Sequence, residues 1–413
     1  MTFGVLTSLV LLGSPAAAQD TLRSSNTPLR DLGDALTVTL ITYEQGGRVF
    51  ERYGHNAIWI HDATGGTDEV YDYGRFSFNQ KNFLLRFIRG QMWYSMGFES
   101  DVRGIVDAYV GQGRKVWMQE LDLPPEAKLK LREFLAWNYR PENKDYAYDY
   151  YRDNCSTRIR DALDRVIGGA IHQYGDSASG WTWRDETRRL NQHSKALYTG
   201  LLVVLGQPVD REMSRWEQMF LPMRLREAMN LIKIPGSDGV LHPVVKSERL
   251  ISPGGRWPAP ERPSNWLLYY VGAGLVLGGL MFLAGQTRAF LPAATLWMLL
   301  VGLLGAFMLI EWVTSYHRAA YSNENLLQFN LAALALAIVL PAGLRGSAWA
   351  QRPVRFLAGA VVGLSILGLI LKPVPWFFQH NLEVIALILP VHLAVWTSTR
   401  RRTRPLESGR QVI

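Results

Sequence analysis

Five long apolar stretches fill the last third of the chain and constrain its fold more than any other feature of the sequence. A helix needs roughly 20 apolar residues to cross a bilayer. The stretches occupy residues 266–283, 291–310, 326–342, 356–371 and 384–397. The last two are short for a span, so the sequence defines their ends only to within several residues. The sequence therefore predicts an α-helical membrane domain of about five spans over residues 265–399.

The part of the chain before these stretches has a different character. Charged residues occur throughout it, and no apolar run approaches the length of a span. At the N-terminus, a short apolar segment is followed by three alanines that end at Ala18. This pattern is typical of a signal peptide over residues 1–18, which predicts that the following segment is exported. We expect an exported domain over residues 19–185, followed by a helical extension and Pro-rich linker over 186–264.

The arginines of the membrane part indicate its orientation. If the N-terminal domain is exported, Arg288 and the clusters at 345–355 and 400–404 all fall on the cytoplasmic side. This agrees with the positive-inside rule. The expected location is therefore a bacterial inner membrane, with a periplasmic N-terminal domain and a cytoplasmic basic tail over residues 400–413. The net charge of +8 belongs largely to these loops, and no basic-aromatic platform for nucleic acid accompanies it.

The exported part shows the patterns of a mixed α+β domain. Alternating apolar residues predict strands at 36–42, 56–61, 70–76 and 116–121. Helices are predicted after Pro124 and after Asn154, the second ending at Gly168. The region from 181 to 250 reads as largely helical, and Pro/Gly-rich segments from 235 onward read as a stiff linker to the membrane.

Cys155 is the only cysteine in the chain, so it forms no disulfide within the chain. It fits no zinc-site spacing, and we expect no metal. What remains is a buried inert thiol, an intermolecular partner or a nucleophile. Asn154 is a natural N-cap, which places Cys155 at the first helical position, where free N–H groups and the helix dipole favour a thiolate. This placement favours the nucleophile.

A Cys nucleophile needs a histidine base and a third group that orients the imidazole. His55 stands at the start of a predicted strand beside Gly54. A hairpin centred on Thr64 and Gly65 places Asp72 opposite Ala57 and diagonal to His55, about 7 Å away between backbones. We therefore predict His55 as the base and Asp72 as its orienting partner. Taken alone, a lone His or Cys is more often structural than catalytic.

Two polar connections face the periplasm in the predicted topology. The first spans residues 311–325 and contains His317, Asn323 and Asn325; the second spans 372–383 and contains His380. One interpretation is an ordinary interfacial belt of polar and aromatic residues. The other is a lipid-headgroup site covered by the exported domain, in which these four residues bind substrate. The sequence leaves both open.

Several strings resemble one known family. They are Tyr53-Gly-His-Asn-Ala, Tyr71-Asp-Tyr-Gly-Arg-Phe, Pro141-Glu-Asn and Tyr148-Asp-Tyr-Tyr-Arg-Asp-Asn-Cys-Ser-Thr-Arg-Ile-Arg-Asp. They resemble the periplasmic domain of the Lnb-type lipoprotein N-acyltransferase family, over most of residues 36–232 and again around 314–330. The order of His before Cys is also similar to that of circularly permuted papain-like (NlpC-like) enzymes, which carry an acyl group on a cysteine.

The resemblance implies that Cys155 is the nucleophile and His55 the base, whereas Asp72 rests on the geometry above. Neighbours within the same strings are expected to shape the substrate-binding site. These are Tyr53, Asn56, Tyr73, Asn154 and Arg158. The implied fold is α+β, a permuted papain-like domain followed by the membrane domain.

The implied activity is acyl transfer without a cofactor. An acyl chain would pass from a membrane phospholipid to the Cys155 thioester, and then to the N-terminal amine of a lipoprotein. Helix N-terminal N–H groups, including that of Cys155, are expected to hold the oxyanion. Two alternatives stay open. A cell-wall amidase or cysteine peptidase would use the same Cys-His pair with water as acceptor, and an envelope scaffold would keep the fold without catalysis.

Overall fold

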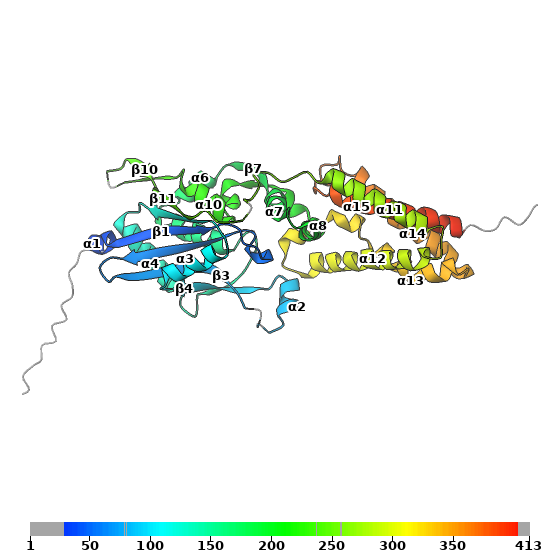
Figure 1. Cartoon of the computed structure of the whole chain (residues 1–413), viewed down its shortest axis with the longest axis horizontal. Coiled ribbons are helices and arrows are strands. Elements are labelled where there is room, and N and C mark those ends of the chain that lie inside the picture. The colour runs from blue at the N-terminus through cyan, green and yellow to red at the C-terminus, as the bar shows by residue number, and fades with distance from the viewer. Residues whose placement is uncertain (1–28, 78, 80, 237, 257, 404–413) are drawn as a thin grey trace, which may run out of the picture.

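The computed structural model describes residues 29–403 except 78, 80, 237 and 257. A sheet-rich domain and a bundle of long helices lie end to end in an elongated molecule (Figure 1). The predicted α+β class with a helical membrane domain is confirmed. The predicted signal peptide lies outside the described residues, as does the tail from Arg404 onward.

A seven-stranded antiparallel sheet forms the centre of the N-terminal domain. Its strand order is β11-β5-β1-β2-β3-β4-β6. In chain order the strands are β1 (Leu36–Tyr43), β2 (His55–Asp62), β3 (Thr67–Arg75), β4 (Trp93–Glu99), β5 (Val116–Leu121), β6 (Asp145–Ala147) and β11 (Val245–Ser252). The four strands that the sequence predicted are confirmed, and β4, β6 and β11 complete the sheet.

Strand β11 corrects the expectation that residues 181–250 are largely helical and that a linker begins near 235. This strand pairs with β5 at the sheet edge, and most of its residues are exposed. Its charged side chains have partners on β5 and α10, because Lys246 Nζ lies 2.6 Å from Glu120 Oε1 and Arg226 pairs with Glu248. A solvated edge strand lacks the apolar alternation that marks a half-buried one, so its pattern gave no strand signal.

Helices cover both faces of the sheet. On one face, α4 (Pro125–Asn138), α5 (Cys155–Val166) and α10 (Pro222–Met229) enclose the main core. On the other face, α3 (Val102–Gly111) contributes Val106 to a smaller core. Further short elements complete the domain: α1 (Leu29–Asp34), η1 (Val49–Glu51), α2 (Phe83–Ile88), α6 (Ala170–Gly175), β7 (Ala178–Thr182), α7 (Trp183–Asn191), α8 (Lys195–Val204), η2 (Gln207–Asp210), β8 (Glu212–Ser214), α9 (Arg215–Gln218), β9 (Lys233–Pro235) and β10 (Leu241–Pro243).

The C-terminal domain has five helices long and apolar enough to cross a membrane among the described residues. They are α11 (Leu267–Ala284), α12 (Phe290–Thr314), α13 (Leu331–Leu344, preceded by η4, Glu324–Leu327), α14 (Ala348–Ile370) and α15 (Leu382–Arg402). All five predicted spans are confirmed. The last two are longer than their apolar stretches because arginines continue the helices at one end, where long side chains reach the membrane surface.

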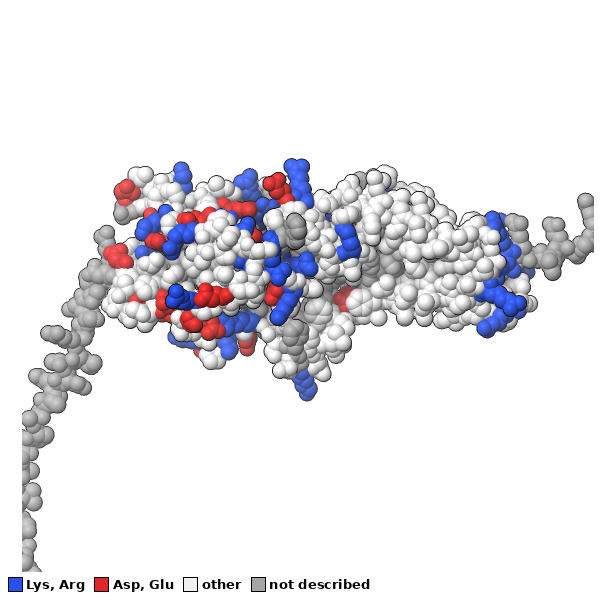
Figure 2. All heavy atoms as spheres, viewed as in Figure 1, with Lys and Arg blue, Asp and Glu red and all other residues white. Residues whose placement is uncertain are grey.

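The charged side chains are distributed unevenly along the surface of the molecule. Figure 2 shows a mostly white helical bundle, with Lys and Arg gathered at the end away from the sheet-rich domain. The arginines of that end include Arg352, Arg355 and Arg400–Arg402. An apolar band therefore lies between the N-terminal domain and the basic end, as a membrane protein requires.

The two domains are joined through the C-terminal end of α8. The last carbonyl groups of a helix have no partner inside the helix. Here the Asn323 side chain donates to Val203 O at 2.9 Å, and the Asn325 side chain donates to Leu202 O at 2.9 Å. The Gln379 side chain donates to Leu205 O at 2.9 Å. The bundle loops at residues 323–325 and 379 therefore cap a helix of the N-terminal domain and fix the two domains together.

A buried ion pair stabilises the same joint. Arg184 Nε lies 2.7 Å from Asp210 Oδ1, and both side chains are almost fully buried. Arg184 also donates to the carbonyls of Leu205 and Gly206. We expect Asp210→Ala to lower the free energy of unfolding by about 3–5 kcal/mol, because the guanidinium is left buried without a counter-charge. Thermal unfolding in detergent measures this.

The control for that variant is Lys246→Ala, which removes a largely exposed ion pair. Little or no change in stability is expected there, because water and salt screen an exposed ion pair. Equal melting temperatures for the two variants would contradict the role given to the buried pair.

Candidate active site

Cys155 stands at the first position of α5, held there by a cap. The Asn154 Oδ1 atom accepts from Ser156 N at 2.9 Å and from Thr157 N at 3.0 Å. The Asn154 amide also donates to the carbonyls of Tyr150 and Phe220. The predicted N-cap is therefore confirmed, and the cap residue is itself anchored on two other segments. This arrangement fixes the backbone from which the Cys155 thiol projects.

His55 begins β2 directly after a tight backbone turn. Gly54 has φ +87°, and a Cβ at this position would lie 2.7 Å from Tyr43 O. Only glycine fits both the conformation and the space. On β3, Gly74 has φ +97°, and a Cβ added there would lie 3.5 Å from Cys155 Cβ. Strands β2 and β3 thus bring their ends against the start of α5.

The three predicted catalytic side chains meet at this point. The β2–β3 register pairs Ala57 with Asp72, as the hairpin argument predicted. His55 Nε2 lies 3.2 Å from Asp72 Oδ2, and the Cys155 side chain is among the groups that raise the pKa of His55. Because Nε2 faces the carboxylate, Nδ1 is the nitrogen left for the thiol. Arg75 Nε donates to Asp72 Oδ1 at 2.8 Å and holds the carboxylate in place.

The surroundings of His55 favour its charged form. Burial disfavours the imidazolium, but the acidic groups of Tyr109 and Cys155 and the hydrogen bonds to Asp72 and Cys155 raise the pKa of His55 well above its ordinary value. Burial likewise opposes ionisation of Asp72, but the hydrogen bond and charge of His55, together with Arg75, lower the pKa of this carboxyl. An ionised Asp72 beside a readily protonated His55 is the electrostatic pattern of a catalytic pair.

These groups open into a cavity of about 610 Å³. Its walls are mainly aromatic and apolar, with contributions from Phe50, Tyr53, Phe76, Tyr94, Ile105, Tyr109, Tyr148, Tyr150, Phe220 and Pro222. The Tyr94 and Tyr148 rings stack at 4.0 Å between centroids. A cavity of this size and lining accommodates an apolar chain next to the Cys155 thiol.

One cation in the cavity wall has unused hydrogen-bonding capacity. Arg114 is 3% exposed, and its Nε donates to Glu44 O at 2.7 Å. Among the described residues, its Nη2 has no hydrogen-bond partner. The guanidinium also lies over the Tyr109 ring, 4.6 Å from the centroid. A buried donor of this kind calls for an acceptor from water or from a bound molecule.

The predicted substrate-binding residues of this domain divide into two groups. Tyr53, Tyr73 and Asn154 line the cavity, although Asn154 serves chiefly as the cap. Asn56 and Arg158 do not line it. The Asn56 amide is buried and donates to Thr42 Oγ1 at 2.8 Å. Arg158 forms a two-point ion pair with Asp153 and covers the Tyr146 ring. These contacts support the site from behind.

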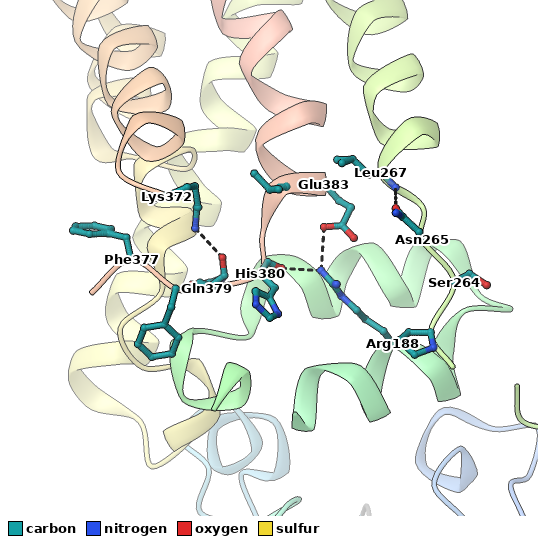
Figure 3. A pocket seen from close by; sticks show the side chains of 12 residues that line it. Arg188, Ser264, Asn265, Leu267, Lys372, Phe377, Gln379, His380 and Glu383 are labelled. Carbon is teal, nitrogen blue, oxygen red and sulfur yellow. Dashed lines mark hydrogen bonds and ion pairs between the residues drawn. The ribbon is translucent and has the colours of Figure 1, made fainter. Parts of the chain in front are cut away.

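The four residues predicted in the periplasmic loops lie outside the catalytic cavity. Asn323 and Asn325 are buried, and their amides cap α8; a substrate contact of these two residues stays a prediction. His317 Nε2 lies 2.7 Å from Phe87 O and connects its loop to α2. His380 lies on a separate cavity of about 650 Å³ between the domains, where Arg188 bonds His380 O and Glu383 (Figure 3).

Fewer N–H groups at the start of α5 are free to hold an oxyanion than the sequence predicted. The Ser156 and Thr157 N–H groups already donate to Asn154 Oδ1. The Cys155 N–H, at the first helical position, has no acceptor within the helix. It is therefore the helix N–H left for a negatively charged oxygen beside the thiol.

Sequence reasoning missed Arg75, Tyr109 and Arg114. Tyr109 lies on α3 and Arg114 in the loop after it, so only the fold brings them to the cavity that contains His55. Arg75 stands in the Tyr71-Asp-Tyr-Gly-Arg string, where its spacing from Asp72 was a usable signal. The run of tyrosines at 146–151 was the other signal, because it supplies much of the aromatic wall.

Within the described part of the chain, no group of three or more His, Cys, Asp or Glu side chains is placed to hold a metal ion.

Comparison with known proteins gives one match. Residues 31–189 match the family described as the Lnb N-terminal periplasmic domain. This range contains β1 to β7, and with them the three predicted catalytic residues Cys155, His55 and Asp72. No curated protein and no solved structure gives a significant match. The likeness to papain-like enzymes therefore stays a prediction from the order of the residues.

Proposed function

We propose that this membrane protein, whose residues 31–189 match the Lnb N-terminal periplasmic domain family, is a cysteine acyltransferase. It takes an acyl chain from a phospholipid, holds it as a Cys155 thioester and passes it to the N-terminal amine of a lipoprotein. One observation carries the proposal. The Cys155–His55–Asp72 cluster opens into an aromatic cavity and is fixed above a helical membrane domain.

In the first half-reaction, His55 accepts the thiol proton and the Cys155 sulfur attacks the ester carbonyl of the phospholipid. The carbonyl oxygen becomes an oxyanion, to which the Cys155 N–H donates. The ester C–O bond then breaks. His55 returns its proton to the departing oxygen, and a lysophospholipid leaves the acyl group on sulfur.

In the second half-reaction, the neutral amine of the acceptor attacks the thioester carbonyl. His55 takes a proton from the amine nitrogen, the C–S bond breaks, and an amide forms. The proton then returns to the sulfur. Asp72 keeps the imidazole in one orientation through both halves, because its carboxylate holds Nε2. An aromatic cavity also limits the access of water, which would otherwise hydrolyse the thioester.

The orientation in the membrane forms part of the proposal. The periplasmic family of the N-terminal domain places that domain outside. The arginines gathered at the opposite end of the bundle then face the cytoplasm (Figure 2). Both lipid substrates consequently reach the catalytic domain from the periplasmic leaflet, and the C-terminus is cytoplasmic.

Reconstitution tests the proposal. The full chain in phospholipid vesicles is incubated with a synthetic diacylglyceryl-cysteine peptide, and mass spectrometry follows the peptide and the lipids. We expect one acyl mass added to the peptide amine for each lysophospholipid formed. Cleavage of added peptidoglycan fragments, without acylation of the peptide, would instead identify a cell-wall hydrolase and contradict the proposal.

Arg114 provides a test of the donor. Its unpartnered guanidinium nitrogen suits a phosphate or carbonyl oxygen of the phospholipid. We expect Arg114→Gln to raise the KM for phospholipid roughly 10- to 100-fold, the value of a buried hydrogen bond to a charged group, with a smaller change in kcat. Arg103→Gln, at an exposed position of α3, is the control. An unchanged KM for Arg114→Gln would contradict a role of Arg114 in binding the phospholipid.

A further inference from the structure

Helix α2 exposes an unusual amount of apolar surface. None of its six residues is buried, and the side chains of Leu84, Leu85 and Phe87 are 68%, 47% and 52% exposed. In Figure 2 the corresponding projection, below the middle of the molecule, is mainly white. A contiguous apolar patch of this kind is unfavourable in water and indicates a surface that contacts something apolar.

Contacts with the bundle fix where this helix lies. Tyr316 N donates to Arg89 O at 2.9 Å, and His317 Nε2 lies 2.7 Å from Phe87 O. Both partners follow directly after α12, which ends at Thr314. Figure 1 shows α2 beside this end of α12, apart from the rest of the sheet-rich domain. The helix therefore lies at the level where a span leaves the membrane.

The side chains around α2 are those of a membrane interface. Exposed aromatic residues occupy the same end of the bundle, namely Tyr269, Trp312, Tyr316 and Trp376. Trp and Tyr at this depth form the aromatic belt of membrane proteins. Lys81, Arg89 and Arg318 are exposed next to the apolar face, and basic side chains at this level attract anionic lipid headgroups. Both the aromatic belt and the basic side chains indicate that the apolar face of α2 contacts the bilayer.

The same segment leads to the catalytic cavity. Helix α2 lies between β3 and β4 in the chain, and Phe76 and Tyr94 flank it at the two strand ends. Their rings are 5.1 Å apart, and Phe76 also meets the Phe50 ring edge to face at 5.7 Å. All three line the cavity that contains Cys155. The aromatic wall of the cavity thus reaches the two strand ends between which α2 lies in the chain.

We propose that α2 inserts into the periplasmic face of the bilayer and forms one wall of the path along which a lipid acyl chain passes to the cavity. The evidence for insertion is the exposed apolar face of α2 and the position of this helix, whereas the passage of the acyl chain rests on the proposed function. Leu84, Leu85 and Phe87 contact lipid chains, the basic residues contact headgroups, and Phe76 and Tyr94 continue the apolar path.

Fluorescence quenching tests the insertion without any catalysis. The full chain carrying Cys155→Ser and Leu84→Cys is labelled with bimane in nanodiscs that contain lipids with a nitroxide high on the acyl chain. The control is Leu241→Cys on β10, which is similarly exposed but lies at the far end of the sheet-rich domain (Figure 1). We expect loss of most of the bimane signal at position 84 and none at 241. Equal signals at the two positions would overturn the insertion.

Activity tests the passage of the acyl chain. The double variant Leu84→Glu with Phe87→Glu is compared with Leu241→Glu. We expect transfer from bilayer phospholipid to fall roughly tenfold or more in the double variant, since two apolar side chains no longer insert among the lipid chains. Transfer from a short-chain, water-soluble phospholipid and alkylation of Cys155 by a small thiol reagent are expected to stay unchanged.

Two results would overturn the role in passage. One is undiminished transfer from the bilayer, and the other is an equal loss with both donors, which would indicate a general structural effect of the substitutions. A chain that lacks transferase activity altogether would still give the quenching result. The fluorescence and activity arms therefore separate a failure of this inference from a failure of the proposed function.

Discussion

Replacing Cys155 with alanine is expected to abolish N-acylation of lipoproteins in a cell that has no second acylating enzyme. Loss of the nucleophile removes the thioester, and losses of roughly 10⁴- to 10⁶-fold are usual when such a residue is deleted. The fold should survive, because the thiol is partly exposed to the cavity and its removal leaves the cap made by Asn154 intact. Mass spectrometry of lipoprotein N-termini measures the result.

The matched control is the neighbouring hydroxyl residue. Ser156 is fully buried, and its Oγ donates to Met219 O at 2.8 Å. Ser156→Ala is expected to cost about 1 kcal/mol of stability through the lost hydrogen bond and to leave N-acylation in place. N-acylation that persists in Cys155→Ala but disappears in Ser156→Ala would contradict the assignment of the nucleophile.

Replacing Asp72 with asparagine is expected to lower the transfer rate by roughly 10² to 10⁴ while the protein stays folded. The carboxylate accepts from Nε2–H and leaves Nδ1 free to take the thiol proton. An amide donates to Nε2 instead and moves the proton to Nδ1, where the base is needed. The variant therefore keeps the contact but stabilises the wrong tautomer.

The pKa of His55 gives an independent readout for the same variant. Asp72 is one of the groups that raise this pKa, so its replacement should shift the His55 titration, followed by NMR of labelled histidine, to lower pH. Asp68→Asn is the control, because Asp68 forms a similar contact with His61 at 2.8 Å outside the catalytic cavity. Equal effects of the two variants on the rate would remove Asp72 from the catalytic cluster.

The sequence was most informative where periodicity is strong. The five spans and the strands β1, β2, β3 and β5 follow from apolar patterns, and the N-cap of α5 follows from Asn154. The parity of the β2–β3 hairpin placed Asp72 opposite Ala57, as the structure has it. Local rules were sufficient here because each of these features is decided within a few residues of the chain.

Features that depend on distant packing could not be predicted. Strand β11 is polar because it lies at a sheet edge, so its pattern looked like a linker. Asn323 and Asn325 were predicted to bind substrate because they lie in a polar connection that faces the exported domain; their bonds to the carbonyls of α8, more than a hundred residues away, could not be predicted. Tyr109 and Arg114 reach His55 only through the packing of α3 on the sheet.

The thioester on Cys155 is the central claim, and trapping it is the most direct test. The full chain is incubated in nanodiscs made from a phospholipid with one defined acyl chain and no acceptor, then digested and analysed by mass spectrometry. The peptide containing Cys155 should gain the mass of that acyl chain and lose it again in neutral hydroxylamine. An unmodified Cys155 in a sample that accumulates lysophospholipid would contradict the account.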